Sequence, residues 1–252
     1  VIVYTTTRRQ VEEVCQALKQ RDIEAAYYHA GLSDSQRDRA QAAWMRDDVS
    51  VLVATSAFGM GVDKPDVRAV IHHQMPGSIE AYYQQAGRAG RDGEKAWCLL
   101  LFNFSDRGIH EWFADNSYPD RSEVGRVWSL LRNRGEGEFD LPDPGHADAM
   151  ADQLSDHGSR LHPMCVESAL RLLEGADVLE LRRDQFAILA TPPVDDLDID
   201  FQRIDRRRRA AKQKIDDLVE YATHNDCLQA RLLGHFGSEP SFGRRCGHCS
   251  GC

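Results

Sequence analysis

The residues best suited to chemistry form two groups, one of arginines among glycines and one of cysteines. Arg88 and Arg91 lie three residues apart within the segment 87–93, which also holds three glycines. A guanidinium group is permanently charged, weakly hydrated and forked, so it suits the negative charge that develops on a phosphoryl group during transfer. The alternative is a helix-capping glycine beside two solvated arginines. The density of the cluster favours the phosphate-directed interpretation.

A second glycine-containing loop follows the apolar run Val51–Ala54. Its segment 55–65 reads Thr-Ser-Ala-Phe-Gly-Met-Gly-Val-Asp-Lys-Pro, with Gly59 and Gly61 two residues apart and Asp63 two residues further on. Glycines allow a backbone to come close to a phosphate or a sugar. The same pattern also occurs in ordinary turns, so this loop alone indicates a nucleotide contact only weakly.

Four cysteines near the end of the sequence have the spacing of metal ligands. They are Cys227, Cys246, Cys249 and Cys252, with 18, two and two residues between them. Thiolates two residues apart can face one ion, and a distant fourth thiolate completes the tetrahedral ligation of Zn²⁺. Four sulfur ligands leave no open position, so the metal is expected to be structural. Unligated thiols, a redox pair, an iron–sulfur cluster and the substitution of His248 for one cysteine are the lesser alternatives.

The composition is that of a globular protein in a reducing compartment. Among 252 residues, 42% are hydrophobic and 28% are charged, and the formal net charge is −9. No run approaches the roughly 18 apolar residues of a spanning helix, and no secretory signal opens the chain. The acidic balance argues against a uniformly basic nucleic-acid coat but permits a local basic groove. Of the seven cysteines, Cys15, Cys98 and Cys165 lie in apolar runs and are predicted to be buried core residues.

The first hundred residues predict an α/β fold. Short apolar runs at residues 1–4, 24–28, 51–54, 69–71 and 96–102 alternate with helical periodicity at 11–18, 33–44 and 79–86. Ser33, with Gln36 three residues later, predicts a capping box. Apolar strands separated by helices indicate a parallel sheet covered on both faces, with ligand-binding loops beyond the carboxyl ends of its strands.

The remainder is expected to form two further domains. In residues 107–194, three helical patterns, including 147–154 and 163–175, precede a hairpin over 178–189, which suggests a winged helix that holds duplex DNA. Arg182 and Arg183, in its turn, are either DNA contacts or a solvated wing tip. Residues 195–252 are predicted to form a helical zinc-binding domain that begins with an acidic spacer and a helix over 201–223.

At this point the motifs resemble a known family. Gln84-x-x-Gly87-Arg88-x-x-Arg91 resembles motif VI of superfamily 2 helicases, and the strings 57–65 and 82–93 look specifically like those of RecQ DNA helicases. Residues 4–8 resemble motif IV, and residues 28–32 resemble the short motif after it. The cysteines, with Tyr-Ala before them at 221–222 and Leu-Leu-Gly-His-Phe-Gly at 232–237, resemble the RecQ zinc-binding domain.

The resemblance implies that residues 1–106 are the second RecA-like lobe of an ATP-dependent motor. By that likeness Arg91 and Arg88 reach the γ-phosphate across an interlobe cleft, and Gln84 couples the nucleotide to strand movement. The nucleotide is further contacted around Gly61, Asp63 and Gly87. The face that grips one DNA strand is implied to carry four residues, Arg8, His29, Thr55 and Ser56.

The resemblance also implies a protein that unwinds duplex DNA in repair and recombination. It would move 3′ to 5′ on single-stranded DNA and act in the bacterial cytoplasm at the nucleoid. One departure from the family pattern concerns the long segment between Phe104 and Cys227. In the familiar arrangement the zinc helices follow the second lobe closely and a winged helix comes after the metal, so the RecQ subgroup and the place where duplex DNA docks stay open.

Two other functions compete with a DNA helicase. An RNA helicase relative would share the motif VI pattern, although the four cysteines and the Phe-Gly-Met-Gly string favour DNA. A non-catalytic DNA-binding scaffold derived from a helicase would have no need of Arg88 and Arg91. The chain begins inside an expected strand and ends on a cysteine, so we expect it to be a piece of a longer protein.

The sequence contains neither a Gly-x-x-x-x-Gly-Lys-Thr/Ser phosphate loop nor an Asp-Glu-x-His element. ATP and Mg²⁺ are therefore expected to be bound mainly by a first lobe that this sequence does not include. We predict that the chain alone binds ATP weakly and hydrolyses it negligibly, with or without single-stranded DNA. A phosphate-release assay tests this expectation, and DNA-stimulated turnover by the chain alone would contradict it.

Overall fold

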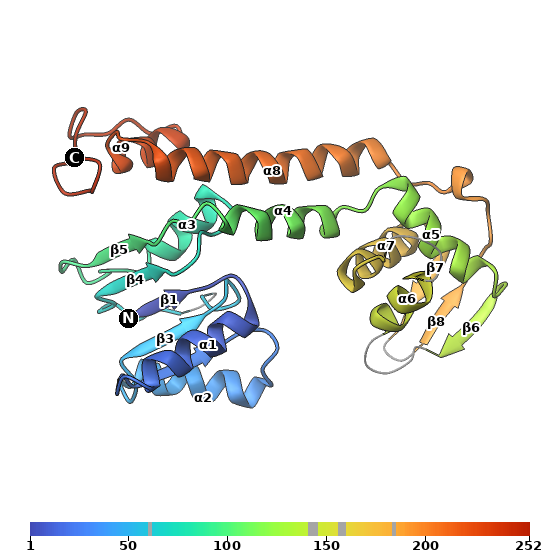
Figure 1. Ribbon diagram of the computed structural model, residues 1–252, viewed down its shortest axis with the longest axis horizontal. Helices are drawn as coiled ribbons and strands as arrows, with labels where there is room; N and C mark the ends of the chain where they lie inside the picture. Colours follow the sequence, from blue (N-terminus) through green and yellow to red (C-terminus); the bar gives the residue numbers. More distant parts are fainter. Residues whose placement is uncertain (60–61, 141–145, 156–159, 183–184) are drawn as a thin grey trace. The chain divides into compact units, whose positions relative to one another are not determined.

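The computed structural model describes residues 1–59, 62–140, 146–155, 160–182 and 185–252 (Figure 1). The chain forms two compact units. The first contains Val1–Gly108 and Lys214–Cys252, and the second contains Ile109–Gln213. The C-terminal residues therefore complete the unit that the N-terminal residues begin.

Five parallel strands form the sheet of the first unit, in the order β2-β3-β1-β4-β5. Their bounds are β1 Ile2–Tyr4, β2 Ala25–Tyr28, β3 Val51–Ala54, β4 Ala69–His72 and β5 Trp97–Leu100. In the centre, Val3 lies opposite Val53 on one side and Ile71 on the other. Because all five strands run in one direction, their carboxyl ends meet at one edge. The expected α/β class with a parallel sheet is confirmed.

Three helices connect these strands, and each begins at a side chain that caps it. The helices are α1 Arg8–Lys19, α2 Asp34–Met45 and α3 Ile79–Ala86. Thr7 and Ser78 accept hydrogen bonds from backbone N–H groups in the first turns of α1 and α3. The predicted capping box of Ser33 and Gln36 is present at α2. These caps set the point at which each strand-end loop becomes a helix.

The central strands are buried on both faces. One face packs against a cluster that includes Trp44 and Phe58, and the other packs against Val11 and Cys15 of α1. The rings of Trp44 and Phe58 meet edge to face with centroids 5.6 Å apart. Apolar side chains alternate toward these two cores, which is why the strands read as continuous apolar runs.

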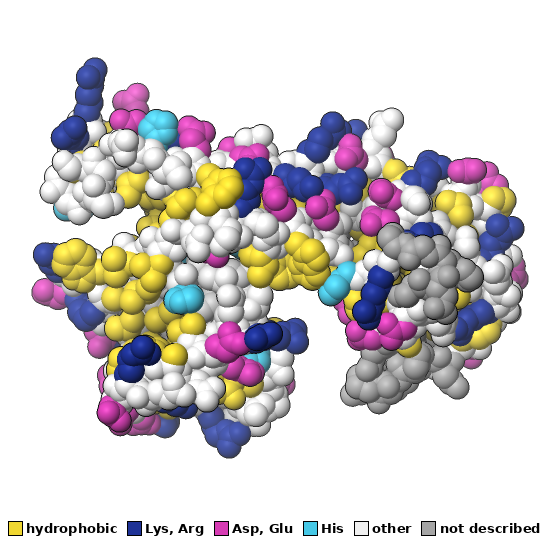
Figure 2. All heavy atoms as spheres, viewed as in Figure 1, with side chains coloured by type: hydrophobic (Ala, Val, Ile, Leu, Met, Phe, Trp, Pro, Cys, Tyr) yellow, Lys and Arg dark blue, Asp and Glu magenta, His cyan; other side chains and the backbone are white. Residues whose placement is uncertain are grey.

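Strand β5 differs from the prediction. It is shorter than the expected 96–102, and Trp97 and Leu99 are 58% and 42% exposed. The prediction that Cys98 is a buried core residue is wrong, because Cys98 is exposed. The physical reason is that β5 is the outermost strand of the sheet, so it has a neighbour on one side only. Hydrophobic side chains gather over this end of the sheet in Figure 2.

The C-terminal helices pack on the first unit through an apolar cluster. Its fully or nearly buried members come from α3, from the residues after β4 and from the end of α8 Phe201–Thr223: Met75, Ile79, Tyr82, Ile215, Leu218 and Tyr221. Helix α9 Leu228–His235 adds Leu228 and Leu232 to its margin. The zinc ligand Cys227 is the residue just before α9. The cysteine-bearing segment is thus anchored to the same body as the sheet.

The second unit has its own core of helices and an antiparallel sheet. Its elements are α5 Arg121–Arg132, β6 Gly137–Asp140, α6 His146–Ser155, α7 Pro163–Gly175, β7 Leu179–Leu181, β8 Gln185–Ile188 and the 3-10 turn Val194–Asp196; the helix α4 Asp106–Ser117 begins in the first unit. The strands lie in the order β6-β8-β7. Trp128, at the centre of the core, is fully buried. The elements follow one another as α5-β6-α6-α7-β7-β8, and the winged helix expected for this segment stays a prediction.

One strand of this unit is absent from the sequence prediction. No strand is predicted at residues 137–140, in a stretch that contains Gly135 and Gly137, yet β6 pairs with β8 and Phe139 lies opposite Phe186. The two rings stack with centroids 5.4 Å apart. Long-range pairing therefore overrides the local glycines. Within the described residues, no helix is both long and apolar enough to cross a membrane.

Candidate functional site

The strand-end edge of the parallel sheet gathers four of the predicted site residues. Thr55 and Ser56 follow β3 directly and His29 follows β2. Arg8 begins α1, with three residues between it and the end of β1. Arg8 and Ser56 are exposed, whereas Thr55 is half-buried. Parallel strands place these positions at one edge of the sheet, and loops at this edge are where ligands of such folds bind.

His29 is the buried member of this group, with 4% of its surface exposed. Its Nε2 lies 3.1 Å from a carboxylate oxygen of Glu12, and its Nδ1 accepts a hydrogen bond from the Gly31 N–H at 3.2 Å. A β-carbon on Gly31 would lie 3.0 Å from a terminal nitrogen of Arg8. His29 therefore shapes the loop on which the Arg8 side chain rests, while Arg8 itself reaches solvent.

Arg88 is held by the loop after β3. Its Nη1 donates a hydrogen bond to the Gly59 carbonyl oxygen at 2.7 Å. Gly59 has a φ of +144°, and a β-carbon there would lie 2.2 Å from Nη2 of Arg88. Only glycine leaves room for the Arg88 side chain at this position. The backbone at Gly59 thus lies close to a guanidinium group, where the sequence suggested a phosphate or a sugar. Among the described residues the buried Nε of Arg88 has no hydrogen-bond partner.

Arg91 lies three residues further along the chain and contacts the same loop. Its Nη1 donates to a carboxylate oxygen of Asp63 at 2.9 Å and to the Val62 carbonyl at 3.4 Å, and its Nε donates to the Gly87 carbonyl at 3.4 Å. The Asp63 side chain is 83% exposed and that of Arg91 is 39% exposed. An exposed ion pair of this kind is worth at most about 1 kcal/mol, so Arg91 can exchange Asp63 for another anion at little cost.

The two glutamines of this helix have different surroundings. Gln84, the predicted coupling residue, is exposed. Its neighbour Gln85 is half-buried, and its amide oxygen lies 2.8 Å from Nε2 of His72 at the end of β4. Burial lowers the pKa of His72 to about 4, so its ring is neutral at pH 7. A neutral ring donates from Nε2 to the Gln85 oxygen, which ties α3 to the sheet.

A row of rings that the sequence does not reveal runs from this site toward the zinc ligands. Tyr4 stacks on His72 at 5.5 Å, His72 meets Tyr82 at 4.9 Å, and Tyr82 meets Tyr221 of α8 at 5.6 Å. Burial raises the pKa of Tyr4, against the opposing effect of Arg88. The row comes from four elements far apart in the sequence, so no local pattern could have indicated it.

Four other predicted residues complete the account of the site. Gly87 lies at the end of α3 and bonds through its N–H to the Tyr83 carbonyl at 2.9 Å. Arg182 bonds to Glu138 at 2.7 Å and to Glu180 at 3.0 Å, so contact between Arg182 and DNA stays a prediction. Gly61 and Arg183 lie outside the described residues.

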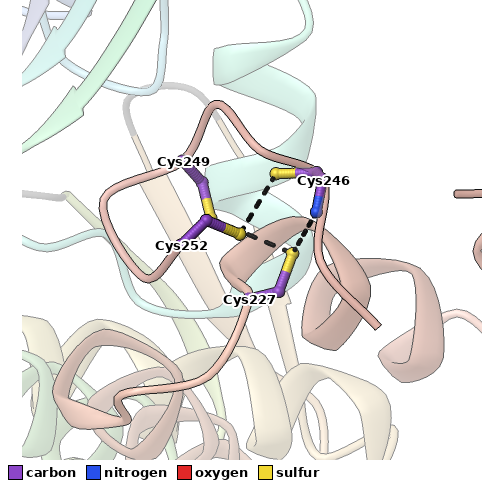
Figure 3. Close-up of side chains that lie close together, drawn as sticks. All are labelled: Cys227, Cys246, Cys249 and Cys252. Atoms are coloured by element: carbon purple, nitrogen blue, oxygen red, sulfur yellow. Dashed lines mark hydrogen bonds between the residues drawn. The ribbon is translucent and has the colours of Figure 1, made fainter. Parts of the chain in front are cut away.

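The four predicted cysteines come together, with their ligand atoms all within 4.8 Å of one another. Figure 3 shows their sulfur atoms facing a common centre. Pairs are separated by 3.5 Å for Cys249 and Cys252, 3.8 Å for Cys246 and Cys252, and 3.9 Å for Cys249 and Cys227. Zinc–sulfur bonds of about 2.3 Å at tetrahedral angles place sulfurs about 3.8 Å apart. The cluster has the dimensions of a closed zinc site.

Backbone groups around the cluster stabilise thiolates. The N–H of Leu228 donates to the sulfur of Cys249, and the N–H of Cys246 donates to the sulfur of Cys227, both at 3.3 Å. Desolvation opposes the charge, but the hydrogen bonds from Cys252 and Leu228 outweigh it and lower the pKa of Cys249 to about 6. The thiolate form is the one that binds metal. The prediction of structural Zn²⁺ is confirmed, with the four cysteines and not His248 as the cluster.

Comparison with known families agrees with both sites. Residues 1–93 match the family described as helicase conserved C-terminal domain, and residues 193–252 match RecQ zinc-binding. The chain is thus built on a helicase C-terminal domain followed, after an intervening stretch, by a zinc module. It is a region of a RecQ family helicase.

Two of the curated relatives to which the chain is similar are DNA helicases. The RecQ-like DNA helicase BLM of Xenopus laevis is 50% identical over 136 residues, which is 52% of this chain and 10% of that protein. The ATP-dependent DNA helicase RecQ of Bacillus subtilis (strain 168) is 45% identical over 122 residues, 48% of this chain and 21% of that protein. The matched region thus spans about a tenth to a fifth of these relatives.

Solved structures add little to this. A DEAD box protein from Methanococcus jannaschii aligns over 42% of this chain and 30% of that chain, with 28% identity and a TM-score of 0.39. Because this TM-score is low, the fold of the first unit is assigned from the strand order of its sheet and not from superposition on that structure.

The zinc site yields a direct prediction. A β-carbon at Gly251 would lie 2.0 Å from the backbone oxygen of Asp226, next to the ligand Cys227, so Gly251→Ala must displace one side of the cluster. We expect purified Gly251→Ala to hold well under one zinc per chain, measured by plasma mass spectrometry. Ser250→Ala, at the exposed neighbouring position, should keep about one zinc per chain. Equal zinc contents in the two variants would contradict the assignment.

Proposed function

We propose that this chain is the second motor lobe and zinc module of an ATP-dependent helicase that unwinds duplex DNA with 3′ to 5′ polarity. The proposal is carried by one observation, the attachment of both Arg88 and Arg91 to the loop that follows β3. That arrangement presents two guanidinium groups beside a strand-end edge. The names of the relatives, which are ATP-dependent and DNA helicases, support the same activity.

In the proposed cycle, ATP is held mainly by a first lobe with its Mg²⁺, and this chain supplies positive charge. Arg91 exchanges the Asp63 carboxylate for the γ-phosphate, and Asp63, together with Gly61 and Gly87, then lies next to the nucleotide. Arg88 stays on Gly59 and fixes the loop. After this exchange, the guanidinium group of Arg91 stabilises the charge on the transferred phosphoryl group. Gln84 relays the closure of the lobes to the DNA.

The proposed DNA grip lies at the same edge of the sheet. Arg8 offers a permanent charge to a phosphate, and the hydroxyl groups of Thr55 and Ser56 offer hydrogen bonds beside it. His29 is buried, so we assign it the role of holding the loop under Arg8. Ser56 is part of the loop that Arg88 holds, so the exchange of Asp63 for a phosphate can alter the contact with the DNA strand. Cycles of lobe closure and reopening would then advance the protein along one strand.

The first test concerns the arginines. In the polypeptide that also carries a first lobe, Arg91→Ala should lower DNA-stimulated ATP turnover about a thousandfold, because a finger arginine contributes on the order of 10³–10⁵ in rate. Arg9→Ala removes an exposed arginine that pairs with Glu13 and should leave the rate unchanged. Turnover is measured by coupled phosphate release. An undiminished rate in Arg91→Ala would refute the role proposed for this residue.

The second test concerns the grip and uses the neighbouring arginines. Arg8→Ala should weaken binding of the chain to single-stranded oligonucleotides and lower the slope of log K against log salt by about 0.7, the value for one phosphate contact on a single strand. Arg9→Ala has the same charge change and should alter neither. Fluorescence anisotropy over a series of salt concentrations measures both quantities. Equal effects of the two substitutions would remove the specific role of Arg8, and tighter binding to RNA than to DNA would favour the RNA helicase alternative.

A further inference from the structure

The charge of the chain is concentrated in one segment. Residues 118–200, here named the acidic segment, hold 18 Asp and Glu against eight Arg and no Lys, a net charge of −10. Since the whole chain has a net charge of −9, the remainder has a net charge of +1. Winged-helix-like units that hold DNA neutralise phosphates with Lys and Arg. The composition of the acidic segment is opposite to that requirement.

Three described arginines of the acidic segment form ion pairs within it. Arg121 pairs with Asp195, Arg160 pairs with Asp152, and Arg182 pairs with two glutamates. A phosphate backbone would have to displace these carboxylates and would meet the others that surround them. DNA could therefore bind these three arginines only if their carboxylates were displaced, and the displaced carboxylates would repel the phosphates.

The helix that would enter a DNA groove also exposes more acidic than basic side chains. In a winged helix this role belongs to the third helix, here α7. Its exposed charged residues are Glu167, Arg171 and Glu174, two acids and one base. The preceding helix α6 exposes Asp148 and Asp152. A groove lined by phosphates would repel this surface.

A hollow on the same unit fits a basic side chain. Its volume is about 500 Å³, and its lining includes Trp112, Glu123, Asp148, His162 and Cys165. Arg160 also lines it, but the charge of this arginine is paired with Asp152 at 2.9 Å. Trp112 is 39% exposed, and its ring meets that of His162 edge to face at 4.5 Å. Within the described part of the chain, Asp148 makes no ion pair. An exposed indole beside carboxylates is a favourable environment for a lysine or arginine side chain.

Two carboxylates lie near the thiol of Cys165, which also lines the hollow. Burial raises the pKa of the Cys165 thiol to about 12, and the nearby Glu123 and Asp120 contribute to that rise. Glu123 already accepts the N–H of Asp120 through one oxygen, in the capping box of α5. The hollow thus combines apolar side chains with the carboxylates of Glu123 and Asp148 and with the paired Arg160, and all of its lining residues belong to one unit.

From this geometry we infer that the acidic segment is a protein-docking module, whose hollow by Trp112 and Asp148 accepts a lysine or arginine side chain from a basic segment of a partner protein. This role goes beyond the helicase function proposed above. Charge complementarity identifies the partner as a basic polypeptide. Duplex DNA, the other occupant of winged-helix surfaces, carries the wrong sign of charge.

The test uses the whole chain and a labelled peptide of about twelve residues composed of Lys, Arg, Gly and Ser, at an ionic strength of about 0.15 M. The double variant Glu123→Gln with Asp148→Asn should weaken binding of this peptide about tenfold, which corresponds to about 1.4 kcal/mol. Gln keeps the capping box at position 123. Trp112→Ala should weaken binding about threefold, as expected for a cation–π contact. Fluorescence anisotropy gives each affinity.

The matched control removes the same amount of charge elsewhere in the acidic segment. Asp196 and Asp198 are exposed and do not line the hollow, so Asp196→Asn with Asp198→Asn should leave the affinity for the peptide within about twofold. An equal loss in control and hollow variants would show diffuse electrostatic attraction and overturn the site. A second arm measures binding to a DNA duplex, where Arg182→Gln should change nothing. A weaker duplex affinity in Arg182→Gln would overturn the inference in favour of DNA.

Discussion

The strand-end edge of the parallel sheet depends on one contact, the hydrogen bond from Arg88 to the backbone carbonyl of Gly59. It joins the end of α3 to the loop after β3, and a side chain at position 59 would occupy the space of the guanidinium group. With Arg88 fixed in this way, Arg91, three residues further along the chain, contacts the same loop and meets Asp63. The first arginine is therefore structural as well as electrostatic, and the second is the one able to change partners. A rigid residue next to an exchangeable one is the arrangement that the proposed exchange of Asp63 for a phosphate requires.

The zinc module shares the body of the sheet because of an apolar cluster, and not because of the metal. Tyr82 of α3 and Leu218 and Tyr221 of α8 are buried together, while the four cysteines lie at the start and beyond the end of α9. The metal closes a short chain segment whose own apolar residues are few. Packing fixes where the module lies within the first unit, and zinc fixes its local fold. Tyr82 is also a member of the row of rings that begins at Tyr4. Its side chain therefore belongs both to this apolar cluster and to the row of rings.

Local patterns predicted much of this structure. The helices Pro163–Gly175 and Phe201–Thr223 begin and end as expected, since periodicity and the proline after His162 are local signals. The four cysteines were recognisable because metal ligation demands a strict spacing. Strand β6 was not, because its stability comes from pairing with β8, which lies far away in the sequence. The exposure of Cys98 depends on which strand is outermost, and the bond between Arg88 and Gly59 spans 29 positions. Such features arise from topology, which the apolar pattern of a single strand does not encode.

The complete absence of lysine from residues 118–200 has a practical corollary for labelling. All five lysines of the chain lie outside that stretch, and Lys64 is engaged with two aspartates and only 9% exposed. Amine-directed dyes and cross-linkers would therefore attach to the sheet-bearing unit and to Lys212 and Lys214 of α8. They would leave residues 118–200 unlabelled, whereas a dye on Lys212, which pairs with Asp115 three residues from Trp112, would lie close to the hollow.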